Sequence, residues 1–573
     1  MEPPLTYTIL QLGHLDDSGD SLHRIRWPGR QIAQQAPHWR VINLSMEAEE
    51  RYAWAERADL LILYQSHDLD LLPVIERRRA RGLKTLAEYN DNFYDPPPTS
   101  NAAEAWGSPL MWQNYELIMK ACDALIVTGP GLESLLATKT TGDIFILENH
   151  CPEAPPPFDR VWTDPVETVN LGWAGSAGHM ADMLSLLPTL RRLMAEFPQL
   201  RLHLMGNAFF RDYPGLDRER LVVRDWGTME DYLDFLTPLH LGLAPMIDTA
   251  YNRCRSDVKA IEMGSRGVLP LLPDRLPYRK ILTDTDMAAC TSLQALHERI
   301  AFYLNHQDRL REDARRFHEY VCQHRVGPLR DERLALYQRM LPTRPEATTW
   351  ALPAGFHETH GTAAPYQPTL ALIQRVASLC GEGKWREALS QTRRARRNNP
   401  AHPDLALLEL RILASAPDGE GDWRAPLRAA RSRFPEDLRF DLFELRHSNS
   451  PSRRAGIWSR LLTRLEKKTA AFQAHHEKEL TSLMETELQQ DHALVEAADR
   501  LLALYPQALA LMQKAALAWE SLGDFAKARD YFQEIASAKQ ALSQEGAFLE
   551  RIDRKWLETW CSALQDRVGN QPP

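Results

Sequence analysis

The first part of the chain alternates short apolar runs with amphipathic stretches, and this alternation limits the folds that it can adopt. Aliphatic runs of this length are typical of buried strands, and the stretches between them have the length and pattern of helices. The runs are YTILQLG (7–13), WRVINLS (39–45), ADLLILYQ (58–65), LKTLAEYND (83–91), DALIVTG (123–129) and IFILEN (144–149). Strands that alternate with helices predict a parallel sheet covered on both faces, whose ligands gather at the carboxyl ends of the strands.

A second series of the same kind follows the proline-rich stretch CPEAPPPFDRVWTDPV (151–166), which is typical of a linker. We expect one helix over 180–198 in this series. The expected strands are VNLGWAG (169–175), LRLHLMG (200–206), RLVVRDWG (220–227), HLGLAPM (240–246) and GVLPLL (267–272). The sequence therefore predicts two successive Rossmann-like α/β domains, 1–155 and 165–342, with a substrate cleft between them.

The rest of the chain changes character. Residues 343–368 are rich in Pro, Gly, Ala and Thr and have no periodicity, which predicts a second linker. From 369 to 573 the pattern predicts helices only, so the fold class is α/β followed by all-α. GKWREALSQTRRARRNNP (383–400) and GDFAKARDYFQEI (523–535) carry glycine, aromatic and alanine residues at the offsets of a tetratricopeptide (TPR) repeat.

These two stretches predict a TPR-like α-solenoid, a fold whose concave face usually holds a peptide or protein. We expect the alanines to let paired helices approach closely. We expect the aromatic residues Trp385, Phe525 and Phe532 to fill the space between the helices. The run RRARR (393–397) then most simply forms a solvated helix face.

The composition excludes several classes of protein. A net charge of −9 and a pI near 6.1 argue against a nucleic-acid partner. Seven cysteines without a C-x-x-C pair do not resemble a disulfide framework or a zinc module, and they suit a reducing compartment. The N-terminus lacks the pattern of a secretory signal, and no window approaches the roughly 18 apolar residues of a membrane span. We expect a cytoplasmic protein with no integral membrane segment.

The stretch LGWAGSAGHMADM (171–183) predicts a strand, a loop of small residues and a helix. Such a loop lets a ligand approach the backbone closely, and exposed N–H groups at a helix start attract phosphate. The residues involved are Gly175, Ser176, Gly178 and His179. Glycines also serve in plain turns, so this motif alone is weak evidence for a site.

The stretch YNRCRSDVKAIEMGSRGVLPLL (251–272) follows a predicted strand, at the edge where ligands gather. A helix over 256–264 would place Ser256, Lys259 and Glu262 on one face. Lys259 and Arg255 could neutralise a diphosphate leaving group, and Glu262 could accept two hydrogen bonds from ribose hydroxyls. An exposed helix with ordinary surface charges would show the same spacing.

Several ordered motifs resemble those of GT-B glycosyltransferases, especially the retaining "group 1" (family 4-like) type. SDVKAIEMGSRGVLPLL resembles their donor-site signature, (K/S)-x-x-K-x-x-E-x-x-x-x-G-x-P-V-V, and the stretch from LGLAPM onward resembles the subgroup pattern APL-x-D-x-x-FN-x-x-KS-x-x-K-x-x-E. EYNDNFYDPPP (88–98) resembles the subgroup's Asp-Asp motif, here Asn90-Asp91, and DSLHRIRWPGRQIA (20–33) resembles its YR-x-x-x-P motif. The resemblance covers about residues 5–340.

The resemblance implies a nucleotide-sugar donor, retention of configuration, and no essential metal or other cofactor. It implies that Glu262 holds the nucleotide ribose and that the Gly175–His179 loop lies beneath the phosphates. It also implies that four residues surround the diphosphate and sugar: Asn252, Arg255, Ser256 and Lys259.

This chain departs from the family pattern at two points. Cys254 stands where many members have a glutamate that contacts the donor sugar, and the 171–183 loop has no Lys or Arg. Inversion therefore stays open, and it would require a first-domain base to deprotonate the acceptor. Asp91, His14 and Asp17 are the candidates, although residues in such positions are more often ordinary loop or capping residues.

We therefore expect a glycosyltransferase whose TPR-like domain recruits a protein or peptide acceptor. One alternative is a glycan or lipid-linked acceptor, with the repeats serving only for docking or oligomerisation. Another is a catalytically inactive scaffold with a peptide-binding solenoid, which the loss of an acidic residue at Cys254 favours and the presence of both Lys259 and Glu262 opposes. HETH (357–360) is not a metalloprotease motif, and we expect no metal there.

Overall fold

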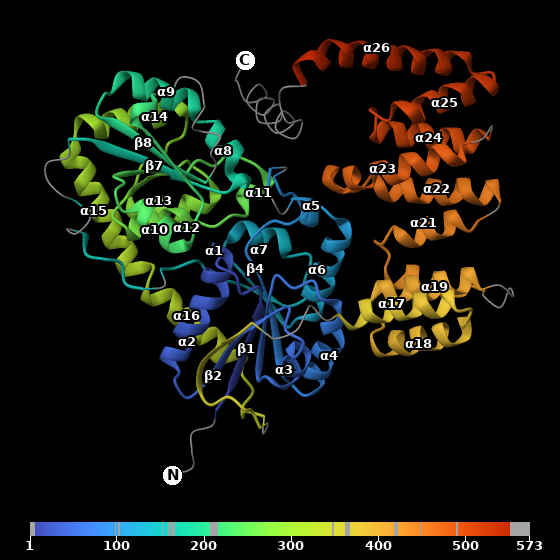
Figure 1. Ribbon diagram of the computed structural model, residues 1–573, viewed down its shortest axis with the longest axis horizontal. Coiled ribbons are helices and arrows are strands. Elements are labelled where there is room, and N and C mark those ends of the chain that lie inside the picture. The colour runs from blue at the N-terminus through green and yellow to red at the C-terminus, as the bar shows by residue number, and fades with distance from the viewer. Residues whose placement is uncertain are drawn as a thin grey trace. The chain divides into compact units, whose positions relative to one another are not determined.

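The computed structural model describes the chain in two compact units (Figure 1). The first holds Met1–Ala103 and Asn114–Tyr366, and the second holds Glu104–Gln113 and Gln367–Glu558. The described residues are 6–549 except 98, 101–102, 152, 159–161, 163–166, 207–215, 347–348, 361–366, 417–421, 449 and 489–490.

The first sheet has seven parallel strands in the order β12-β2-β1-β3-β4-β5-β6. Their bounds are β1 Thr8–Gly13, β2 Arg40–Ser45, β3 Leu60–Tyr64, β4 Lys84–Tyr89, β5 Ala124–Val127, β6 Asp143–Ile146 and β12 Gly355–Thr359. β1 lies between β2 and β3, with Gln11 opposite both Asn43 of β2 and Ile62 of β3. The six strands predicted in this region are confirmed, because continuous aliphatic runs suit strands that are buried on both faces.

Helices cover both faces of this sheet. They are α2 Trp27–Gln35, α3 Arg51–Arg57, α4 Leu72–Ala80, α6 Pro109–Ala121 and α7 Pro130–Leu136, with shorter segments at Gly19–Ser21, Leu22–Arg26 and Ala103–Trp106. The helical stretch between β3 and β4 begins as a 3-10 turn at Leu69–Leu71 and continues as α4. It gives way to a turn at Gly82, whose φ of 78° favours glycine.

The second sheet has five parallel strands in the order β11-β10-β7-β8-β9. Their bounds are β7 Val169–Ala174, β8 Leu200–Gly206, β9 Leu221–Asp225, β10 Leu241–Leu243 and β11 Leu269–Leu271. From β7 the chain builds the sheet on one side as β8 and β9, and then crosses to the other side as β10 and β11. The reversal lies between β7 and β10, which is where open α/β sheets bind ligands.

The helices of this second domain differ from the prediction at one point. The single helix expected over 180–198 is two helices, α8 Met180–Leu184 and α9 Leu187–Glu196. Pro188 lies in the first turn of α9, where a missing backbone N–H costs little but inside a longer helix would break it. The others are α10 Met229–Leu236, α11 Ala250–Arg253, α12 Val258–Ser265, α13 Arg279–Thr285, α14 Leu293–Asn305 and α15 Gln307–His324.

The predicted boundary at 342 and the predicted linker over 343–368 both need correction. Helix α16 (Gly327–Met340) returns to the first sheet, where Arg333 pairs with Glu88 at 2.9 Å and Tyr337 donates to Gln11 at 2.8 Å. Strand β12 lies inside the expected linker, includes most of HETH, and pairs with β2. A single edge strand far from its sheet neighbours in sequence carries no local signal, which is why the pattern suggested a linker.

The second unit is all helical over its described part, as the sequence predicts, and Figure 1 shows the helices running from α17, α18 and α19 at one end of the array to α26 at the other. Gly383 (φ 76°) and Gly523 (φ 87°) end α17 and α25 alike. The next N–H reaches back five residues, from Lys384 to Leu379 at 2.8 Å and from Asp524 to Trp519 at 2.9 Å. The helices are α17 Pro368–Gly381, α18 Trp385–Asn398, α19 Pro403–Ser415, α20 Arg424–Arg433, α21 Arg439–Arg446, α22 Pro451–Leu465, α23 Ala470–Glu487, α24 His492–Leu504, α25 Leu509–Ser521 and α26 Phe525–Leu549.

The packing of the predicted repeat positions is mixed. Ala388 and Ala528 are buried and Trp385 is half-buried, as expected. Phe525 is 69% exposed and Phe532 is 41% exposed, so these aromatic residues do not fill the space between helices. Among the helices described, none combines the length and the apolar character that a membrane crossing requires.

Candidate functional site

The predicted site residues lie where the carboxyl edges of the two sheets contact each other. His23, in the π-helical segment Leu22–Arg26 after β1, lies 2.9 Å from Glu262 on α12, measured from Nε2 to Oε1. Asn149, after β6, donates to Ser256 Oγ at 3.0 Å. Asn92, after β4, donates to the carbonyl of Ala250 at 3.3 Å. Residues that follow strands of both domains therefore form one polar cluster.

Helix α12 begins later than predicted. Asp257 caps it without a side-chain bond to the backbone, because Arg325 holds the Asp257 carboxylate with two hydrogen bonds of 2.5 and 3.0 Å. Ser256 therefore precedes the helix and does not share its face. Lys259 and Glu262 remain one turn apart on α12.

Lys259 is half-buried and reaches the end of the central strand of the second sheet. Its Nζ donates to the carbonyl of Ala174, the last residue of β7, at 2.6 Å. Burial and the nearby Arg255 lower the pKa of Lys259 to about 8, against the opposing effect of Glu262. The ammonium group therefore lies at the start of the Gly175–His179 loop and is still mostly charged at neutral pH.

Both carboxylate oxygens of Glu262 have partners. Oε1 faces His23, and Oε2 accepts from the hydroxyl of Tyr232 on α10 at 2.9 Å. Trp226 stacks on Tyr232 with ring centroids 5.8 Å apart, and its other face is open because the residue is 53% exposed. A ribose that bonded to Glu262 would have to replace or share one of these partners.

Arg255 joins the two halves of the cluster. Its guanidinium lies 4.6 Å from the ring centre of Tyr251 and donates to the Tyr251 hydroxyl at 3.3 Å. Its Nη1 lies 2.8 Å from Nε2 of His179. Burial lowers the pKa of Arg255, but Tyr251, Asp91 and Asp182 outweigh that effect and leave it raised. Arg255 is therefore a fixed cation.

The side chains of His179 and Asn252 face a carboxylate that the sequence did not single out. His179 Nδ1 lies 3.1 Å from Oδ2 of Asp182, and Asn252 donates to Oδ1 of Asp182 at 2.9 Å and to the carbonyl of Ile247 at 3.0 Å. All three polar residues are buried. The structure thus places His179 and Asn252 inside the protein, engaged with Asp182.

The Gly175–His179 loop allows close backbone approach. Gly175 donates to Met205 at 3.1 Å, and a Cβ on Gly206 (φ 127°) would lie 2.2 Å from the Gly175 carbonyl oxygen, so only glycine fits there. Ser176 is exposed, and Gly178 lies beside Arg255. Since α8 has only five residues, the positive charge here comes from Arg255 and Lys259 more than from a helix dipole.

The first domain contributes two carboxyl groups. Asp91 bonds to the Tyr251 hydroxyl, and burial together with Asp20 raises the pKa of Asp91 to about 7. Asp20 has solvent-accessible atoms but is surrounded by the cluster, and this desolvation raises its pKa as well. Asp20 accepts from Asn90 at 2.8 Å, and Asn90 in turn accepts from Tyr64 at 2.9 Å.

The other two candidate bases are less favourably placed. Asp17 is 77% exposed and pairs with Arg26 at 2.6 Å. His14 is exposed, and its carbonyl accepts from Ser21 at 2.7 Å. Of the three candidates, Asp91 is the one whose carboxyl joins the cluster.

Cys254 lies at a close contact between the domains. It is 6% exposed, and a Cβ on Gly131 of α7 would lie 2.0 Å from the carbonyl oxygen of the preceding Arg253. Burial, followed by the charge of Asp91, raises the pKa of the Cys254 thiol to about 12. The Cys254 side chain is therefore a neutral thiol at neutral pH.

The cluster residues that sequence reasoning missed include Asp20, His23, Asp182, Tyr232 and Tyr251. Asp20 and His23 lie within the quoted DSLHRIRWPGRQIA motif, and Asp182 lies one helical turn after His179. Their proximity to recognised motifs was a usable signal. Their partners, however, come from other elements.

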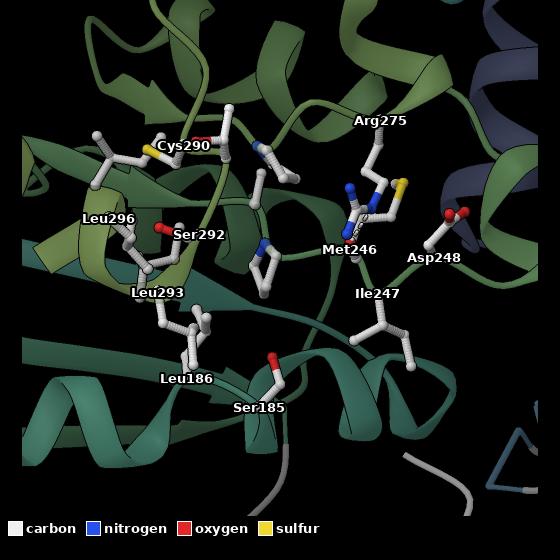
Figure 2. Close-up of a pocket in the computed structure, with 16 residues that line it drawn as sticks. Ser185, Leu186, Met246, Ile247, Asp248, Arg275, Cys290, Ser292, Leu293 and Leu296 are labelled. Carbon is white, nitrogen blue, oxygen red and sulfur yellow. Dashed lines mark hydrogen bonds between the residues drawn. The ribbon is translucent and has the colours of Figure 1, made fainter. Parts of the chain in front are cut away.

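A cavity of about 250 Å³ lies beside the cluster at the ends of β10 and β11 (Figure 2). Its lining is largely apolar, with Leu186, Met246, Leu293 and Leu296 among the labelled side chains. Ile247 belongs to this lining, and its backbone N–H donates to Asp182 at 2.8 Å. The lining contains none of the predicted site residues.

No protein-family model matches the chain, and no curated protein does. Among solved structures, a mutant O-GlcNAc transferase of Thermobaculum terrenum matches with 16% identity over 59% of this chain and 68% of that one, at a TM-score of 0.39. HepE of Anabaena in complex with UDP matches with 11% identity over 58% of this chain and 100% of that one, at a TM-score of 0.41. MnaA of S. aureus with UDP matches with 11% identity over 60% of this chain and 100% of that one, at a TM-score of 0.38. These values are low, so the roles of the residues depend on this chain's own contacts.

Proposed function

We propose that this chain is a glycosyltransferase that moves a sugar from a nucleotide-sugar donor to an acceptor. One observation carries the proposal: Arg255, Lys259 and Glu262 meet at the carboxyl edge of the second sheet, beside the reversal of strand order, with Lys259 bonded to the end of β7. Two cations and a carboxylate at this position suit a diphosphate and a ribose. The motif resemblance to GT-B enzymes supports the same assignment.

The chemistry requires little of the protein beyond placement and charge. The bond between the anomeric carbon and the phosphate oxygen breaks, and its electron pair leaves with the phosphate. Lys259 and Arg255, which are already fixed by Ala174, Tyr251 and His179, would stabilise that developing charge. No metal ion or other cofactor is needed for this role in our proposal.

The nucleoside would bind beside this pair. Glu262 would accept hydrogen bonds from the ribose hydroxyls, with the donor taking the place of His23 at Oε1. The open face of Trp226 would stack on the base, since Trp226 is exposed and packs on Tyr232, the other partner of Glu262. In this arrangement Asn252 holds Asp182 and the Ile247 carbonyl, and Ser256 holds Asn149, rather than the donor.

The acceptor oxygen forms the new bond to the anomeric carbon and loses its proton. The motif resemblance favours retention, in which the proton passes to the departing phosphate oxygen. Under inversion Asp91 would take the proton, and its pKa of about 7 suits a base that works near neutral pH. The anomeric configuration of the product, read from proton NMR coupling constants, decides between the two.

The first experiment is a thermal-shift screen of the full chain against UDP-, GDP-, ADP- and CMP-linked sugars. A donor at 100 times its Kd stabilises the folded state by about 2.7 kcal/mol, which raises the melting temperature measurably. Binding of one nucleotide class together with sugar transfer or donor hydrolysis supports the proposal. Binding of none of them supports the inactive scaffold instead, which the neutral Cys254 favours.

We further propose that the helical unit recruits a protein or peptide acceptor, as TPR-like arrays do. Mass spectrometry of candidate acceptors co-expressed with the full chain and with a chain ending at Tyr366 tests this. The cut must follow β12, because removal of that strand would damage the first sheet. If the shortened chain still binds donor but modifies the same proteins to the same extent, the helices do not recruit the acceptor, and a glycan or lipid-linked acceptor becomes the better candidate.

A further inference from the structure

Three side chains from different parts of the second domain form a row behind the proposed phosphate position. Asp182 lies on α8, His179 lies at the end of the 3-10 turn Ala177–His179, and Arg255 lies between α11 and α12. The row runs from Asp182 Oδ2 to His179 Nδ1 at 3.1 Å and from His179 Nε2 to Arg255 Nη1 at 2.8 Å. His179 and Arg255 are 76 residues apart in the chain.

The chemistry of the two neighbours determines the protonation of His179. A guanidinium group only donates hydrogen bonds, so Nε2 must offer its lone pair to Arg255. Nδ1 then carries the proton and donates it to the Asp182 carboxylate. His179 is therefore neutral, in agreement with its pKa, which burial, Arg255 and Lys259 hold well below the usual range.

Asp182 is itself held in place. Its Oδ1 accepts from the backbone N–H of Ile247 at 2.8 Å and from the side chain of Asn252 at 2.9 Å, and the carboxylate is 2% exposed. Both donors belong to the segment that follows β10. Asp182 thus anchors His179 to the loops on either side of the reversal point of the second sheet.

We propose that His179 is a positioning residue, whose neutral imidazole holds Arg255 where the donor diphosphate binds, with Asp182 fixing the tautomer. This inference rests on the proposed function and changes the role that sequence suggested, since His179 contacts Arg255 and not the donor. A free arginine side chain loses rotamer entropy when it is immobilised. Tyr251 and His179 cause that loss during folding, before the donor arrives.

The first test does not depend on activity. The full chain is labelled with nitrogen-15 histidine, and the signals of His179 are assigned by comparison with His179→Asn. We expect a protonated Nδ1 and an unprotonated Nε2 at neutral pH without any ligand. A proton on Nε2, or an imidazolium, would overturn the proposal whatever the protein binds.

The second test separates positioning from direct contact. His179→Phe keeps a ring of similar volume but removes the hydrogen-bond acceptor. We expect it to lower kcat/KM for the donor about 10- to 100-fold. His179→Gln has an amide oxygen that can accept from Arg255, so we expect it to retain a large part of the activity that His179→Phe loses. His297→Phe, which removes an imidazole that pairs with Glu196 far from the site, is the matched control.

The decisive comparison uses Arg255→Ala. If His179 acts only through Arg255, His179→Phe causes little further loss of kcat/KM in the Arg255→Ala background. Losses that multiply in the double variant would mean that His179 acts on the donor directly, and the proposal would fail. If the native chain binds no nucleotide sugar, the proposed function is wrong. The nitrogen-15 measurement of the His179 tautomer does not depend on that outcome and tests the proposed contact with Arg255 separately.

Discussion

The two sheet edges that form the site differ in charge although burial acts on both. At the second-domain edge, Lys259 has a pKa of about 8 and Arg255 remains a fixed cation. At the first-domain edge, Asp20 and Asp91 have raised pKa values, and Asp91 reaches about 7. Burial favours the neutral form of every group, so it lowers the pKa of a cation and raises the pKa of an acid.

This difference indicates what each edge can do. Two cations next to a glycine loop stabilise negative charge, and a carboxyl that titrates near neutrality can take a proton. Arg255 connects the two edges, because Tyr251 bonds to both Arg255 and Asp91. A bound diphosphate would raise the pKa of Lys259 again, because an opposite charge at short range favours the protonated form.

The largest effect is expected from removal of the cation at the end of β7. Lys259→Ala should lower kcat about 10²- to 10³-fold, the loss seen when one preorganised group is removed from a developing negative charge. Initial rates of sugar transfer or donor hydrolysis measure it. Lys120→Ala, at an exposed lysine paired with Glu116, is the control and should keep the native rate. A native rate for Lys259→Ala would show that the Lys259 ammonium does not stabilise the charge that develops on the departing phosphate.

The acidic edge is tested by Asp91→Asn. If Asp91 is the base, the rate at pH 8 should fall about 10²-fold, and the native acid limb with an inflection near pH 7 should disappear. Asp17→Asn, at the exposed candidate, should keep both rate and limb. An unchanged pH profile in Asp91→Asn would favour retention without a protein base.

Stability provides a second measurement on the same variant. The folded-state pKa of Asp91 is raised, so the native state binds more protons than the unfolded state between about pH 4 and 7. The contribution of this group to stability therefore decreases as pH rises through that window. Asp91→Asn should have a higher melting temperature than the native chain at pH 8 and little difference at pH 4, measured by calorimetry.

Removal of the carboxylate of Glu262 should affect binding more than chemistry. Glu262→Ala should weaken donor binding by about 1.5–3 kcal/mol, the range of hydrogen bonds to charged groups. Isothermal calorimetry with the nucleotide that the screen identifies measures the change. Glu148→Ala, which removes an exposed pair with Lys280, is the control. An unaltered dissociation constant would refute the ribose assignment.

A smaller effect is expected at the exposed aromatic residue. Trp226→Ala should cost about 1–2 kcal/mol of nucleotide affinity, within the range for stacking of a base on an aromatic ring. Because Trp226 is 53% exposed, the melting temperature of the Trp226→Ala variant should differ little from that of the native chain. If Trp226→Ala lost as much affinity for a sugar phosphate without a base as it loses for the nucleotide, stacking of the base on Trp226 would be contradicted.

The smallest effect concerns metal ions. In the proposed mechanism Arg255 and Lys259, which are held by His179 and Ala174, neutralise the phosphate without a metal ion, so an excess of EDTA should leave the transfer rate unchanged within error. The rate before and after chelation, and after addition of Mg²⁺ or Mn²⁺, measures this. A rate that falls with EDTA and recovers with metal would show that these cations are not sufficient.

Periodicity and glycine caps are local properties of the chain, so the strands other than β12, the helical unit and the one-turn spacing of Lys259 and Glu262 could be predicted from the sequence alone. Which side chains meet depends on how the whole chain folds. His23 faces Glu262 across 239 residues, α16 and β12 return to the first sheet, and Asp182 and Arg255 together set the tautomer of His179. Such contacts depend on how two sheets face each other, and no local pattern in the chain encodes that arrangement.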